Sequence, residues 1–254
     1  MGTSSSFKGK KGDALLPNDF SSEDNEKHFE DNNSENNDNI ENTNRPNWTA
    51  AKTSMTKYLS SGGNIGSPKK VVSNYVGATG GARAFSSRQG ISSAGSNFSH
   101  LLNSITRRGF TTTIASLGDQ FKNKSTAESV SLLANYVVEN SISKDDTAIR
   151  SATVNTLEEM SSLLGDNNSL TEIEAKYLLQ FFTRELIWQI MLVDYGISFE
   201  KKGSNVEEVI ILEKGIKDYI QSCVEVGFNS YKADYYTVDS FNKILTSCLE
   251  IMED

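Results

Sequence analysis

Apolar residues return every three or four positions through most of the second half of the chain, which is the spacing of one helix face. The segment 171–195 is apolar on most of its faces, a property typical of a helix at the centre of a bundle. The pattern predicts helices over residues 126–140, 145–164, 171–195, 205–226 and 238–252. Three capping-box pairs precede such segments: Ser125 with Glu128, Ser169 with Glu172, and Ser204 with Glu207.

The preceding region predicts shorter helices separated by glycines. They cover residues 49–60, 69–76, 96–108 and 110–117. Two short segments, 196–200 and 231–236, suggest extended structure, but no run of alternating residues predicts a sheet. The expected fold class is therefore all-α, a multi-helix, bundle-like domain with a more polar N-terminal lobe.

The first 47 residues lack the apolar content of a folded core. Residues 18–47 contain only Phe20, Phe29 and Ile40 as large apolar side chains, too few to offset the entropy lost on ordering. We therefore predict a disordered, tethered N-terminal tail. The expected organisation has four parts, namely an extended recognition segment (1–17), a disordered linker (18–47), a basic helical lobe (48–118) and an acidic helical core domain (119–254).

Charge is strongly segregated within the net value of −8. Residues 42–118 contain nine Lys and Arg residues and no Asp or Glu, whereas residues 119–254 contain 23 acids and 12 bases. Such asymmetry predicts contacts with an acidic protein surface, or alternatively a nucleic-acid-binding module in the 42–118 region. Its aromatic residues are few, which makes a stacking platform for single strands less favoured.

The hydrophobic segments and the cysteines of the chain bear on its cellular location. No apolar run approaches the roughly 18 residues of a membrane span, and the start lacks the apolar core of a secretory signal. Cys223 and Cys248 both fall within helical patterns, so we expect buried free thiols. Together these features predict a cytoplasmic protein.

The first seventeen residues form the principal candidate site. Gly2 is small enough for Met1 to be removed, which would expose an unhindered α-amino group as a modification acceptor. The following positions combine small, basic and apolar residues suited to a narrow partner groove: Thr3, Ser4, Ser5, Lys8, Lys10, Lys11, Leu15, Leu16 and Pro17. One alternative is a plain disordered terminus. Another is an N-myristoylated membrane adaptor, because Met1-Gly2 followed by Ser6 fits that motif.

A glycine-rich segment at residues 77–90 is the second candidate. Glycine amides can face an anion and arginines can complete the site, so this segment predicts contact with an anion or an acidic partner. The candidate residues are Gly80, Gly81, Arg83, Arg88, Arg107 and Arg108. The segment lacks the Lys-Ser/Thr ending of a P-loop and the spacing of a dinucleotide fingerprint, so a hinge between helices is an equal alternative.

The sequence offers no catalytic constellation. His100 stands alone in the helical part, and a nucleophile needs a base beside it. Two cysteines 25 residues apart without a nearby histidine are poor metal ligands. We therefore predict no catalytic residue, no metal site and no cofactor, and expect that the protein is not an enzyme.

Short motifs in the chain resemble the QatB family of the Qat anti-phage defence operons. They are Met1-Gly-Thr-Ser with Lys-Gly and Leu-Leu-Pro17, Trp48 with Ala51-Lys52, Asn74-Tyr75-Val76, and Gly80-Gly81-Ala82-Arg83. The chain departs from the family pattern at Phe7-Lys8 and in its long Asn/Asp-rich insert at 18–47. The resemblance covers residues 1–17 and 48–118 best.

The resemblance implies a set of partners. The main one is a QueC-like protein, and the operon's ATPase and TatD-like nuclease are further candidates. QueC-type enzymes activate a deazaguanine carboxylate with ATP and join it to an amine. The resemblance therefore implies a non-enzymatic defence component whose Gly2 amine is recognised or modified.

Overall fold

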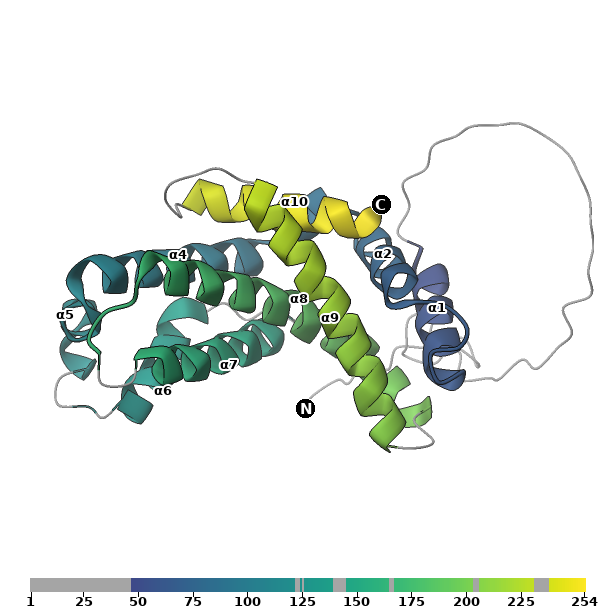
Figure 1. The fold of residues 1–254 in the computed structure, drawn as a ribbon, viewed down its shortest axis with the longest axis horizontal. Helices are drawn as coiled ribbons and strands as arrows, with labels where there is room; N and C mark the ends of the chain where they lie inside the picture. Colours follow the sequence, from purple (N-terminus) through teal and green to yellow (C-terminus); the bar gives the residue numbers. More distant parts are fainter. Residues whose placement is uncertain are drawn as a thin grey trace, which may run out of the picture. The chain divides into compact units, whose positions relative to one another are not determined.

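The computed structural model describes residues 47–121, 124, 126–138, 145–164, 167–202, 206–230 and 238–254, all of them helices or short connections (Figure 1). Within these ranges there is no strand, which confirms the all-α prediction. The helices are α1 (Trp48–Ser60), α2 (Pro68–Ala78), α3 (Ala82–Ser86), α4 (Gln89–Arg108), α5 (Phe110–Leu117), α6 (Thr126–Val138), α7 (Asp146–Leu164), α8 (Glu172–Lys202), α9 (Val206–Ser230) and α10 (Val238–Glu253), with a 3-10 turn at Asp119–Phe121.

One of the two segments predicted to be extended was wrong. Residues 196–200 are not extended but belong to α8, which continues to Lys202. A single glycine such as Gly196 costs a helix only about 1 kcal/mol, so it does not end one that already has a buried face. The second segment expected to be extended, 231–236, lies outside the described residues.

The capping box of α8 also differs from the predicted one. Thr171, not Ser169, is the capping residue, because its N–H and hydroxyl both donate to Oε2 of Glu174 at 2.7 and 2.8 Å. The N–H of Glu174 donates back to the Thr171 hydroxyl at 3.2 Å. These hydrogen bonds lower the pKa of the Glu174 carboxyl. Ser125 and Ser204, from the other two predicted boxes, lie outside the described residues.

Helix α8 forms the centre of the described helices. It packs against α1, α4, α7 and α9, as its nearly continuous apolar sequence predicts. The α7–α8 interface also buries one carboxylate, Glu185. That charge is compensated by Arg184, whose Nη2 lies 2.9 Å from Oε1, and by Asn155, whose Nδ2 donates to Oε2 at 2.9 Å. A buried carboxylate requires such partners.

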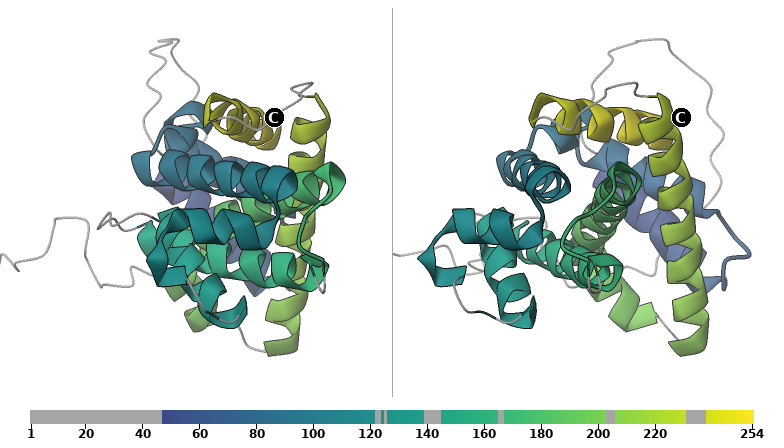
Figure 2. Two further views of the ribbon diagram at one scale, coloured as in Figure 1. Left: turned by 90° about the vertical axis from the view of Figure 1, so that its left-hand side faces the viewer. Right: turned by 60° about the vertical axis from the view of Figure 1, so that its left-hand side comes forward.

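The last helix, α10, packs against α2, α3 and α4 and crosses α9 (Figures 1 and 2). Small residues permit this close approach, because a Cβ atom on Gly95 would overlap the Phe241 ring and one on Gly227 would lie 2.5 Å from Cys248 Sγ. A polar contact fixes its position along α4, where Asn242 Nδ2 donates to Ser92 Oγ at 2.7 Å. The C-terminal helix therefore closes the core formed by residues far earlier in the chain.

Candidate partner-binding site

The predicted site at the start of the chain lies outside the described residues. This applies to the acceptor Gly2 and to the proposed partner-binding residues between Thr3 and Pro17. Their roles stay predictions. The structure does show how the helical part of the chain starts, at Asn47 and Trp48.

Trp48 fixes the first turn of α1 to the helical core. Asn47 caps the helix, with its side chain accepting from the N–H of Ala50 at 3.0 Å. The Trp48 ring then meets the edge of the Tyr75 ring, with centroids 6.0 Å apart. Tyr75 in turn contacts Phe85 and Tyr195 at centroid distances of 6.3 and 5.4 Å. The cluster joins α1, α2, α3 and α8. The first turn of α1 is therefore held in a defined position on the core.

Tyr75 is the polar centre of this aromatic cluster. Its ring is fully buried and its hydroxyl donates to Oδ2 of Asp194 at 2.9 Å. Burial and the neighbouring Asp194 carboxylate both raise the pKa of Tyr75 well above the ordinary value of 10.0. Burial also raises the pKa of Tyr195. Both phenols therefore stay protonated in the folded protein at neutral pH.

We expect this cluster to make stability depend on alkaline pH. The folded protein holds the Tyr75 proton more tightly than the unfolded chain, so the stabilisation is complete below pH 10 and is lost as the pH rises towards the folded pKa. The loss is at most about 1.4 kcal/mol per pH unit for each such tyrosine. Urea unfolding at pH 8 and pH 10.5 measures it, and Tyr75→Phe should reduce the difference. An unchanged difference would contradict this assignment.

In the glycine-rich turn between α2 and α3, the backbone amides of both glycines donate hydrogen bonds to carbonyl groups of α2. The N–H of Gly80 donates to Gly77 O at 3.2 Å, and that of Gly81 donates to Val76 O at 3.0 Å. Both glycines have positive φ angles, 97° and 88°, as residues that end a helix often do. A Cβ on Gly81 would lie 3.0 Å from a carboxylate oxygen of Glu253. These contacts favour the hinge alternative over an anion site at this turn.

The four candidate arginines are not brought together. Arg88 lies before α4, where it pairs with Asp145 at 3.3 Å and stacks over the Phe85 ring at 5.0 Å. Arg107 and Arg108 lie at the other end of α4, about 30 Å from Arg88 by the length of the helix. Arg83 is exposed on α3. The structure therefore does not assemble one anion site from these residues, and contact of Arg83, Arg107 or Arg108 with an acidic partner stays a prediction.

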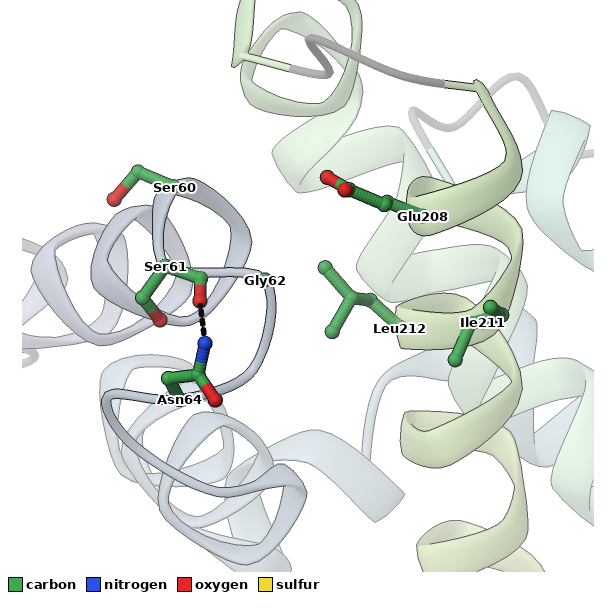
Figure 3. Close-up of a pocket in the computed structure, with 7 residues that line it drawn as sticks. All are labelled: Ser60, Ser61, Gly62, Asn64, Glu208, Ile211 and Leu212. Carbon is green, nitrogen blue, oxygen red and sulfur yellow. Dashed lines mark hydrogen bonds between the residues drawn. The ribbon is translucent and has the colours of Figure 1, made fainter.

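A surface pocket of about 340 Å³ opens between the α1–α2 turn and the first turns of α9 (Figure 3). The end of α1 contributes Ser60, the turn contributes Ser61, Gly62 and Asn64, and α9 contributes Glu208, Ile211 and Leu212. Figure 3 shows Glu208 and Leu212 pointing from α9 towards the turn. Asn64 Nδ2 donates to Ser61 O at 2.8 Å and holds the turn. Hydroxyl, amide and carboxylate groups thus surround an aliphatic floor.

Exposed isoleucines lie on the two segments that form this pocket, and one of them, Ile211, lines it. Ile65, Ile210 and Ile211 are 60%, 58% and 67% exposed, although most isoleucines of the described helices are buried. An exposed apolar patch with a polar rim is typical of a protein-interaction surface. The sequence analysis missed these residues, and the available signal was the adjacent pair Ile210-Ile211, which cannot both face the core of one helix.

Other candidate chemistry is limited in the described part of the chain. No group of three or more His, Cys, Asp or Glu side chains there is arranged to hold a metal ion. None of its helices has the length and apolar character to cross a membrane. His100 is exposed on α4. Cys223 and Cys248 are buried free thiols, as predicted, and burial raises the pKa of Cys248 to about 12.

Comparison with known proteins gives the family. A family model described as Qat anti-phage system associated protein QatB matches residues 80–252. The match includes α3 to α9 and almost all of α10, and it places this chain, whose described part is all-helical, among the proteins of Qat anti-phage defence systems. The chain belongs to the QatB family. Searches of the curated proteins and of the solved structures found no match.

Proposed function

We propose that this protein binds the QueC-like component of its defence system and presents Gly2 to it for recognition and covalent modification. The observation that carries the proposal is the position of α1. Trp48 is packed against Tyr75 at one end of this helix, and the pocket opens at the other end, roughly 18 Å away by helix length. A partner held at the pocket therefore sits one helix length from Trp48, the first residue of α1, which follows the N-terminal region.

The proposed chemistry suits a glycine at the terminus. ATP activates the deazaguanine carboxylate as an acyl adenylate, with release of pyrophosphate. The neutral Gly2 amine then attacks the acyl carbon, an amide bond forms, AMP leaves and one proton is released. An α-amino group has a pKa of about 8, which leaves a useful neutral fraction at pH 7. All of the activating groups belong to the partner, so the QatB-family protein acts as the acceptor and not as the catalyst.

An Ile211→Asp variant tests the pocket. Ile211 is 67% exposed, so the substitution should leave the melting temperature nearly unchanged. A charge placed against an apolar partner surface should weaken the complex with the QueC-like protein at least tenfold, as measured by calorimetry or by co-purification. Val226→Asp, at a 56% exposed site further along α9, is the matched control. Equal binding by the parent and by Ile211→Asp would remove the pocket from the proposal.

A further inference from the structure

A second exposed surface lies on the seam between α7 and α8, away from every residue discussed so far as a site. Ile173, Tyr177, Phe181 and Arg184 follow one another at spacings of four, four and three, so they share one face of α8. Ile173 is 82% exposed and Tyr177 is 41% exposed, while Phe181 and Arg184 are partly exposed. We call these four residues the α8 stripe.

The α8 stripe is held in one arrangement by its own contacts. The Tyr177 hydroxyl donates to Glu159 Oε1 on α7 at 2.9 Å, and its ring lies 6.2 Å from that of Phe181. The Arg184 guanidinium stacks over the Phe181 ring at 4.2 Å and is fixed on its other side by Glu185. Ordered side chains lose less entropy on binding, and Tyr and Arg are enriched in the residues that dominate binding energies.

We propose that the α8 stripe binds a basic, amphipathic helix of another protein in the defence complex. The stripe runs over twelve residues, or about 16 Å from its first to its last Cα atom, which matches three turns of a partner helix. Exposed Glu172 directly precedes Ile173, and exposed Glu158 is next in sequence to Glu159, which contacts Tyr177. Lys or Arg residues on the partner would therefore meet opposite charge. A nucleic acid would meet repulsion at these carboxylates. A second copy of the chain is the rival occupant that the crosslinking experiment below separates from a basic helix.

Charge and apolar variants in the co-expressed defence complex test this surface. Ile173→Asp should reduce retention of one component on the tagged chain at least tenfold, and Glu158→Lys with Glu172→Lys should weaken it further as ionic strength falls. Val226→Asp should retain the whole complex. Parent-like retention by Ile173→Asp, or equal loss in Val226→Asp, would overturn the proposal.

Photocrosslinking identifies the occupant without relying on a destabilised variant. With p-benzoylphenylalanine in place of Ile173, we expect a crosslink to a Lys/Arg-rich amphipathic segment of a defence-system protein. A crosslink to a second copy, to nucleic acid or to an acidic segment would contradict the proposal. The surface does not depend on Gly2, so this crosslink should persist in Gly2→Leu even if presentation of the terminus fails.

Discussion

Replacing Gly95 with alanine should lower the free energy of unfolding by about 2 kcal/mol. A Cβ atom at this position in α4 would overlap the Phe241 ring, so α10 must shift or the ring must leave its place. Phe241 also contacts Phe182 of the central helix, with centroids 6.1 Å apart, so the strain reaches the core. Overpacking of this kind costs about 1–3 kcal/mol. Chemical unfolding of the purified variant measures the loss.

Gly77→Ala is the matched control for this prediction. Gly77 lies inside α2, and a Cβ there would meet no atom within 4 Å. Alanine should therefore raise the free energy of unfolding by about 0.5–1 kcal/mol through its higher helix propensity. Glycine to alanine should therefore lower the free energy of unfolding at position 95 and raise it at position 77. A Gly95→Ala variant as stable as the parent would show that α10 does not pack against α4 as described.

Gly2→Leu should abolish protection against phage while leaving the helices intact. A leucine at position 2 keeps Met1 in place, so the α-amino group proposed as the acceptor never forms. The described core begins at Trp48, so circular dichroism and the melting temperature should match the parent. Plaque counts on cells that carry the complete operon measure protection, and we expect them to equal those of cells without the operon.

Gly2→Ala separates loss of the terminal amine from crowding beside it. Methionine is still removed, but a methyl group now stands next to the amine. A tight partner cleft should respond with partial loss of protection, between the parent and Gly2→Leu. If Gly2→Leu protects fully and the complex still forms, the terminus has no role in defence and the proposed function fails.

The fold was predictable because it follows from local periodicity. The 3.6-residue apolar pattern identified the long helices, and the nearly continuous apolar run in 171–195 correctly placed α8 at the centre. Boundaries were less accurate, because several signals compete at a helix end. Thr171 and Ser169 both offer a hydroxyl three residues before a glutamate, and only the hydrogen bonds to Glu174 decide between them. At Gly196, the helix continues despite the local preference for a break.

The candidate site was less predictable because it depends on contacts between distant segments. The pocket joins Asn64 to Leu212, and no local pattern relates those positions. Arg88 and Arg108 were grouped by charge, but the length of α4 separates them. Gly80 and Gly81 looked suited to an anion until their amides were found to donate within the turn. By contrast, Trp48 and Tyr75, which were noted as separate motifs, lie in one aromatic cluster.

The mass of the N-terminal peptide, purified from cells that carry the complete operon, tests the central claim most directly. The account predicts a peptide without Met1 whose Gly2 amine carries a deazaguanine acyl group in amide linkage. Cells lacking the QueC-like protein should yield the same peptide with a free amine. A peptide from the complete operon that retains Met1, carries myristate or ends in an unmodified glycine would contradict the account.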